Sequence, residues 1–170
     1  VSGSLEVAMG LETAHPGVLE KLNKGMTLEQ FAAAADRLRS NDVDLRVFLL
    51  ARPPFMPESE AFTWAARSLD FAFDCGATAA TLIPTRAGNG AMDALAVQGL
   101  FSPPSLAMLE EATAYGISLA RGRVFADLWD VERFASCEVC REARIARLHR
   151  MNREQQIQPA IDCAACGGRS

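Results

Sequence analysis

Four of the five cysteines stand in two Cys-x-x-Cys pairs near the C-terminus, Cys137 with Cys140 and Cys163 with Cys166. Each pair can place two thiolates about 2.3 Å from a shared metal ion, and four thiolates form the tetrahedral set that Zn²⁺ favours in structural sites. The 22 intervening residues are slightly more than a simple zinc ribbon has, and a helix at 141–157 would fill the separation. We therefore expect these four cysteines to be metal ligands.

The identity of the metal stays open at this point. Four thiolates also hold Fe–S clusters, so an auxiliary cluster is an alternative to zinc. The Gly167-Gly168 pair after the last cysteine resembles the turn of a zinc knuckle and favours zinc. Four free thiols are the third interpretation. Cys75, which precedes Gly76 at a predicted helix end, is expected to be a buried small side chain.

A second group of polar residues directly follows apolar runs. Glu12, Arg52 and the pair Thr85-Arg86 each come at the end of such a run. In a parallel α/β sheet the carboxyl ends of the strands meet at one edge, where ligands bind. The sequence therefore predicts that these side chains share one ligand-binding edge.

The elements that must position these residues alternate regularly along the chain. Apolar runs predict strands at 4–12, 45–51, 78–83 and 123–128. Helical periodicity predicts helices after Pro16, from Thr27 to the turn at 41–42, and at 58–75, 91–97 and 103–121. This order predicts a parallel sheet with right-handed crossovers, and its regular spacing favours half of a (β/α) barrel over an isolated sheet.

The composition changes from Phe134 onward. We expect a basic, amphipathic helix with six cationic or titratable residues between the cysteine pairs. Because the composition changes at this point, we divide the chain into a barrel part, 1–133, and a four-cysteine tail, 134–170. The basic face of this helix could contact RNA phosphates, or it could be an ordinary solvated face. A net charge of −4 gives no general attraction to nucleic acid.

Composition also limits location and completeness. Neither a long apolar run nor a signal peptide is present, and the cysteine pattern fits a reducing compartment, so we expect a cytoplasmic protein with no membrane partner. The chain begins at Val1 and not at a methionine, which we interpret as a fragment or a processed chain.

Several stretches together resemble a known enzyme family. The first is Gly10-Leu11-Glu12-Thr13 with the following His15-Pro16 and the helix that ends in Leu22-Asn23-Lys24-Gly25, which is similar to a strand and helix of radical S-adenosylmethionine (SAM) enzymes of the elongator and methylthiotransferase type. The longer stretches are Arg46–Phe55, Asp70–Ala77, Ile83–Met92 and Gly122–Asp130. They resemble the radical SAM subunits of archaeosine synthases and their bacterial relatives, and the resemblance covers nearly the whole chain.

This resemblance implies an α/β fold, the C-terminal half of a partial (β/α)6 radical SAM barrel with a small four-cysteine tail. It implies a reduced [4Fe–4S] cluster that cleaves SAM to methionine and a 5′-deoxyadenosyl radical, an electron donor and a partner enzyme subunit. The implied substrate is a modified 7-deazaguanine base in tRNA, cleaved in a lyase-type step. The implied SAM contacts are Glu12, Arg52, Ile83, Pro84, Gly88 and Asn89.

Each of these residues also has an ordinary structural interpretation. Glu12 would accept hydrogen bonds from the ribose or amino group of SAM, or it is a solvated or paired carboxylate. Arg52 would hold the SAM carboxylate with its planar guanidinium fork, and Arg46 is the second candidate for this role. Asn89 is equally a turn residue. Asp127 and Asp130, at the last strand end, contact substrate or cap the next turn.

The chain departs from the family in one respect. The Cys-x3-Cys-x2-Cys motif that holds the catalytic cluster is not in this sequence. We expect its ligands upstream of Val1, and we expect this chain alone to be inactive. The alternative hypothesis is a module without redox chemistry, whose zinc-binding four-cysteine tail binds RNA or protein.

Overall fold

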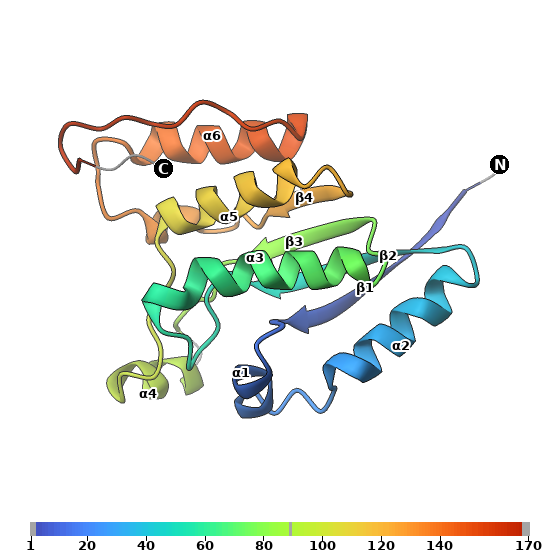
Figure 1. Cartoon of the computed structure of the whole chain (residues 1–170). Coiled ribbons are helices and arrows are strands. Elements are labelled where there is room, and N and C mark those ends of the chain that lie inside the picture. The colour runs from blue at the N-terminus through green and yellow to red at the C-terminus, as the bar shows by residue number, and fades with distance from the viewer. Residues whose placement is uncertain (1–2, 89, 168–170) are drawn as a thin grey trace.

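The computed structural model describes residues 3–88 and 90–167. Its strands and helices follow the predicted order (Figure 1). The elements are β1 (Leu5–Glu12), α1 (Pro16–Lys21), α2 (Leu28–Arg39), β2 (Val43–Leu50), α3 (Glu58–Asp74), β3 (Ala79–Ile83), α4 (Ala91–Val97), α5 (Leu106–Ser118), β4 (Arg123–Ala126), a 3-10 helix (Val131–Phe134) and α6 (Arg141–Glu154). The 3-10 helix was not predicted.

Local sequence determines where the first helices begin. The side chain of Thr27 accepts the backbone N–H of Gln30, and Gln30 accepts the N–H of Thr27, which is the predicted capping box of α2. At α1, His15 Nδ1 accepts the N–H of Val18, and Pro16 occupies the first turn, where its missing N–H costs no hydrogen bond. His15 also stacks on Trp64 at 4.3 Å. This lone histidine therefore has a structural role.

The four strands form one parallel sheet in the order β1-β2-β3-β4. Neighbours in the sheet are thus neighbours in sequence, joined by α1 and α2, by α3, and by α4 and α5. Side chains of α2, α3 and α5 pack on the same sheet face. The mixed α/β architecture with a parallel sheet is therefore confirmed.

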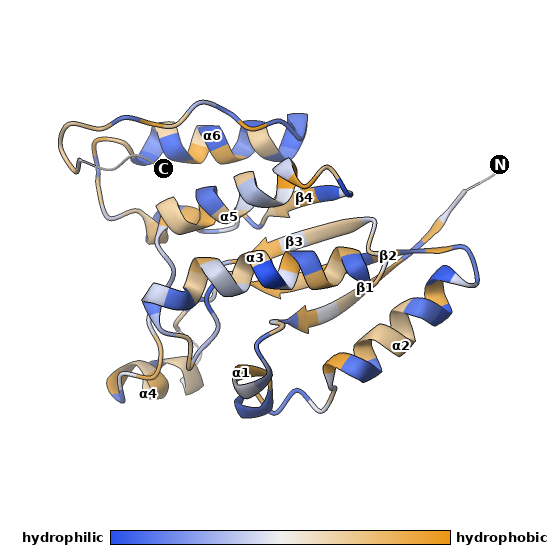
Figure 2. Cartoon of the chain, viewed as in Figure 1, coloured by the Kyte–Doolittle hydropathy of each residue, from blue (hydrophilic) through white to orange (hydrophobic). Residues whose placement is uncertain are grey.

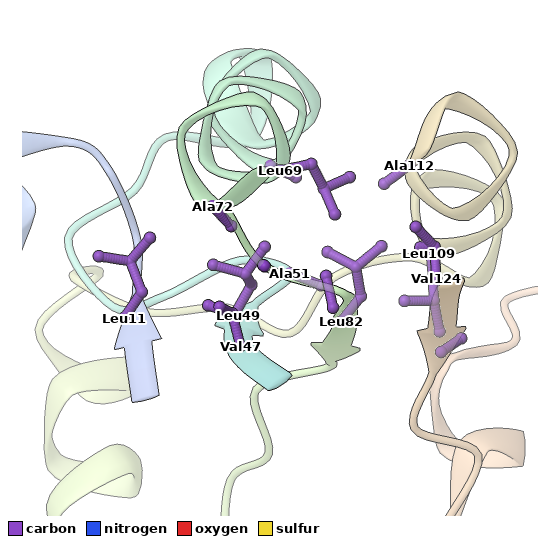
Figure 3. Packing of buried hydrophobic residues seen from close by; sticks show 14 of the residues in the cluster. Leu11, Val47, Leu49, Ala51, Leu69, Ala72, Leu82, Leu109, Ala112 and Val124 are labelled. Atoms are coloured by element: carbon purple, nitrogen blue, oxygen red, sulfur yellow. The ribbon is translucent and has the colours of Figure 1, made fainter. Parts of the chain in front are cut away.

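The hydrophobic core lies between that sheet face and the helices. In β2, Leu45, Val47 and Leu49 alternate with partly exposed residues and are almost fully buried. Figure 3 shows Leu69 of α3 above the sheet near Leu82, and Leu109 of α5 beside Val124 of β4; all four belong to the same core. Burying each such side chain contributes about 1.5–3 kcal/mol. This packing of helices on the sheet holds the four strands, and therefore the residues at their carboxyl ends, in fixed relative positions.

The opposite face of the sheet carries the alternate residues of each strand. Phe48, Leu50, Ile83 and Phe125 are only partly exposed there, without being buried. Arg46 also lies on this face, where it binds Glu6 at 2.8 Å and lies 5.2 Å from the Phe125 ring. Within residues 3–88 and 90–167 the sheet has four strands and does not close, so a barrel is not part of this chain by itself.

The two edges of the sheet differ. At β4, the side-chain amide of Asn152 binds both the N–H and the C=O of Ala126 at 2.8 Å. Gln155 binds the N–H and C=O of Val124 in the same way, at 2.7 and 2.9 Å. Two side chains of the α6 end therefore occupy the hydrogen-bonding positions of a neighbouring strand. β1, in contrast, pairs with β2 alone among the described strands.

The tail packs on the sheet unit. Figure 2 shows α6 as mostly hydrophilic, yet its Leu148 and Met151 are fully buried in the same core as the sheet. α6 contacts α5 and β4. Nowhere in the described part of the chain is a helix long and apolar enough to span a membrane.

Candidate metal centre and strand-end site

The four paired cysteines meet at one point, as the sequence predicts. The Sγ atoms of Cys137, Cys140, Cys163 and Cys166 all lie within 4.8 Å of one another. Cys137 and Cys163 are 3.9 Å apart, as are Cys140 and Cys166. A tetrahedral ion with bonds of about 2.3 Å needs sulfur atoms roughly 3.8 Å apart. The four thiols are thus spaced to hold one metal ion.

The protonation of these thiols is uneven. Backbone N–H groups of Cys140 and Val139 lower the pKa of Cys137 to about 7. At Cys140, the N–H of Arg144 lowers the pKa, but burial and hydrogen bonds with the other three thiols outweigh it and raise the pKa to about 11. A metal ion that binds here must therefore displace protons.

A buried ionic network connects the metal centre to α5. Arg144 Nε lies 3.3 Å from Cys140 Sγ, and the same guanidinium forms a short ion pair with Glu110. Arg147 pairs with the other carboxylate oxygen of Glu110 at 3.1 Å and donates to the carbonyl of Gln158. Glu110 is fully buried. Its two arginine partners supply the compensation that a buried carboxylate requires.

The sequence analysis did not identify Glu110 as part of a site. Glu110 lies four residues after Leu106 and one after Leu109, in phase with the apolar stripe of α5. An acidic residue at such a core position is rare, and this could have indicated a buried ion pair. The basic helix was interpreted as facing RNA or solvent. For Arg144 and Arg147 both interpretations are wrong, because these two side chains are buried on Glu110.

The metal centre remains accessible from solvent. Cys166 is exposed, and a cavity of about 150 Å³ borders the cluster. Its lining includes Ser105 at the start of α5, Arg144, and the cysteines 137, 140 and 166. Small chelators and metal ions therefore have a path to the thiols.

At the end of β1, Glu12 has a left-handed backbone with φ of 67°, next to an irregularity in the pairing with β2. Its carboxylate forms a short ion pair with Lys24 and lies over Gly10, where an added Cβ would be 2.6 Å from Glu12 Oε1. Strained backbone of this kind is concentrated at functional sites. Glu12 is thus held in place, with Lys24 as its partner in this structure.

At the end of β2, Arg52 is buried, with only 8% of its surface exposed. One guanidinium nitrogen donates to the carbonyl of Pro103 at 3.2 Å and lies 3.5 Å from Glu58. Its Nε is buried without a hydrogen-bond partner. A guanidinium with an unused buried donor is a candidate for binding an anionic ligand group.

Beyond β3, Ile83 is partly buried and Pro84 is buried. The next loop is organised by Asp93, whose carboxylate accepts the N–H of Gly88 and the N–H of Gly90, each at 3.0 Å. Asp93 was not singled out from the sequence, although it stands at the third position of a predicted helix, where carboxylates cap. Asn89 lies outside the described residues.

The end of β4 carries a second arginine cluster. Arg86 pairs with Asp127 at 3.0 Å and donates to the carbonyls of Pro84 and Trp129. Asp130 adopts a left-handed backbone and pairs with Arg133. The predicted polar residues therefore do gather at the carboxyl ends of β3 and β4, and much of their charge is already paired.

Two known proteins are similar to this chain. Over 102 residues it is 30% identical to the archaeosine synthase subunit beta of Methanosarcina acetivorans, a match that covers 59% of this chain and 30% of that protein. Over 105 residues it is 26% identical to an uncharacterized protein of Methanocaldococcus jannaschii, covering 61% of this chain and 29% of that protein. No protein-family model matches the chain.

The matched region thus spans less than a third of the length of these relatives. The chain is therefore distantly similar, over more than half of its length, to one subunit of an archaeosine synthase.

Proposed function

We propose that this chain is the C-terminal part of a radical SAM Fe–S enzyme that acts on a modified 7-deazaguanine base in tRNA, in an archaeosine-type lyase step. The observation that carries the proposal is the similarity to an archaeosine synthase subunit together with a parallel sheet whose polar residues collect at the strand ends. When bound, SAM and a reduced cluster supply a 5′-deoxyadenosyl radical that abstracts hydrogen from the substrate.

The shape of the sheet supports a partial (β/α)6 barrel completed by preceding strands. Helices cover one face, as on the outside of a barrel, and the other face presents partly exposed apolar residues such as Phe48 and Phe125. The edge at β4 is closed by Asn152 and Gln155, whereas β1 is an edge strand that pairs with β2 alone among the described strands. Added strands would therefore pair with β1.

The residues at the strand ends fit the polar parts of SAM. Arg52 has a buried guanidinium with an unpaired Nε, which suits the SAM carboxylate. Glu12 is a fixed hydrogen-bond acceptor for the ribose or the amino group. The apolar Ile83-Pro84 segment and the loop with Gly88 and Asn89 would border the adenine ring. Ligands for the catalytic cluster are expected outside this chain, in an upstream Cys-x3-Cys-x2-Cys.

For the tail we propose a single Zn²⁺ with a structural role. Sulfur spacings of 3.9 Å match one tetrahedral ion. In a [4Fe–4S] cluster each cysteine binds a different iron atom, and in a [2Fe–2S] cluster two cysteines bind each iron, so both place some sulfur atoms farther apart than a mononuclear site does; here all four lie within 4.8 Å of one another. The site also joins the N-terminus of α6 to the segment that follows the helix, so the ion would hold the tail on α5.

The full-length protein tests the radical reaction. It is reconstituted anaerobically with iron and sulfide, reduced, and assayed for 5′-deoxyadenosine and methionine. We expect one [4Fe–4S] cluster on upstream cysteines, and a raised KM for SAM in Arg52→Lys, which keeps the charge and loses the fork. Arg121→Lys, at an exposed ion pair with Asp74, is the matched control. Full-length protein that binds no cluster, or cleaves no SAM, contradicts the proposal.

The competing function is a binding module without redox chemistry. Burial of Arg144 and Arg147 removes the central cations from the face that would contact RNA, which weakens this alternative for α6. Reading the coding sequence upstream of Val1 separates the two functions. An upstream Cys-x3-Cys-x2-Cys supports the enzyme, and a frame without it leaves the binding module.

A further inference from the structure

Trp129 lies three residues beyond the end of β4 and is exposed over 71% of its surface. Tryptophan is a large, mainly apolar side chain that is usually well buried, so its exposure costs solvation free energy. Its position is also specific, because it stands at the carboxyl end of a parallel strand, the edge at which such sheets bind ligands. The exposed indole ring at this edge is therefore a candidate contact for a flat ligand.

The backbone of Trp129 is held on both sides. Its N–H donates to Asp127 Oδ1 at 3.1 Å, and its carbonyl accepts a short hydrogen bond from Arg86. Arg86 and Asp127 are themselves paired at 3.0 Å. Arg86, Asp127 and the Trp129 backbone are thus bonded to one another, which holds the position from which the indole projects. A side chain positioned in advance loses less conformational freedom when a ligand binds.

One side of the indole is already occupied. The Arg86 guanidinium lies 5.0 Å from the Trp129 ring centre and 5.7 Å from that of Phe134, so it is flanked by two aromatic rings. Only 14% of the Arg86 side chain is exposed. With a buried cation behind it and most of its own surface in solvent, the ring offers a flat free surface for stacking.

We propose that Trp129 is a stacking platform for an unpaired nucleobase of the RNA substrate, an inference that rests on the proposed function. Stacking of bases on aromatic side chains is the usual mode of single-strand recognition. The guanidinium beside the platform, that of Arg86, is already paired with Asp127, so we assign the contact to the base and not to a phosphate.

The test uses the full-length protein and a tRNA-derived hairpin with 2-aminopurine at the target position, whose fluorescence falls when the base stacks. Trp129→Ala should lose the quenching and bind the hairpin about 5- to 150-fold more weakly. Trp129→Phe, which keeps a ring, should retain most of both. Trp64→Phe is the control, because Trp64 belongs to α3 and its ring contacts the ring of His15 at 4.3 Å. Circular dichroism verifies that each variant folds.

The possible failures are distinguishable. If wild-type protein binds the hairpin and Trp129→Ala binds it equally, the platform is wrong and the tRNA substrate stands. If wild-type protein binds no RNA, the tRNA part of the proposed function fails and the platform with it. If Trp129→Ala changes only the oligomeric state, the indole is a protein contact and the inference is overturned. SAM cleavage without RNA, measured in parallel, reports on the radical reaction separately.

Discussion

Arg144 Nε lies 3.3 Å from the sulfur of Cys140, and its guanidinium is fixed by the fully buried carboxylate of Glu110. This contact joins the metal centre to a helix of the sheet unit. Four thiolates around a divalent ion carry a net charge of −2, and Glu110 with Arg144 and Arg147 carries +1. The network therefore offsets part of the charge of an occupied centre.

Removing this donor should weaken metal binding. We expect Arg144→Ala to lower the Zn²⁺ affinity about 10- to 100-fold, the usual effect of losing a group that orients a metal ligand. Competition against a chromophoric chelator measures it. Arg150→Ala, an exposed arginine on the same helix, should bind as wild type does. Equal affinities for the two variants would show that the Arg144 contact is incidental.

Neutralising the buried carboxylate should cost stability. Glu110→Gln removes the carboxylate charge that two buried arginines share, for which we expect a loss of about 3–5 kcal/mol in the free energy of unfolding. Urea denaturation of the zinc-loaded protein measures this loss. The neighbouring Glu111 is exposed, and Glu111→Gln should stay within about 0.5 kcal/mol of wild type. A small effect at Glu110 would mean that water compensates the arginines.

Metal affinity should fall as pH falls. The pKa of Cys140 is raised to about 11, so its thiol is protonated at pH 7 and must lose its proton when the ion binds. The pKa of Cys137 is about 7, so its proton begins to compete below that pH. Calorimetry in two buffers of different ionisation enthalpy should show proton release, with the affinity declining between pH 8 and 6. Cys75→Ser should change neither result, and a pH-independent affinity would argue against thiolate ligation.

The sequence predicted features that depend on neighbouring residues and missed those that depend on distant ones. The capping box of Thr27 and Gln30 is local and was confirmed. The cysteine spacing predicted convergence of the four thiols, because ligand chemistry restricts how they are used. The burial of Arg144 depends on Glu110, 34 residues away, and the charge pattern of α6 alone resembles that of an exposed helix. The pairing of Glu12 with Lys24 at the end of β1 likewise depends on how the chain folds, so the sequence pattern did not identify it.

The amide groups that close the β4 edge should protect it from association. Asn152→Ala leaves the N–H and C=O of Ala126 without partners, at an expected cost of about 1–3 kcal/mol. The freed edge should also pair with other chains, seen as concentration-dependent oligomers in size-exclusion chromatography. Arg153→Ala, at the next position on the exposed side, should remain wild type in both measurements. A stable, unassociated Asn152→Ala would show that water replaces the amide.

Two glycine substitutions should separate ligand binding from stability. A Cβ at Gly10 would lie 2.6 Å from Glu12 Oε1 and 2.9 Å from Lys24 Nζ, the ends of flexible side chains that can move aside. Gly10→Ala should therefore fold normally while displacing the Glu12 carboxylate. If Glu12 binds SAM, the SAM affinity of the full-length enzyme should fall.

Gly116→Ala should have the opposite effect. Its Cβ would lie 2.8 Å from Val124 Cγ1 and 3.1 Å from Leu69 Cδ1, both in the packed core, where overpacking costs about 1–3 kcal/mol. Thermal unfolding should show the loss, and SAM affinity of the folded enzyme should not change. SAM binding is measured for both variants by equilibrium dialysis. A carboxylate that contacts SAM should change the SAM affinity when it is displaced. If Gly10→Ala binds SAM as wild type does, the Glu12–Lys24 pair is therefore structural and Glu12 is not a SAM ligand.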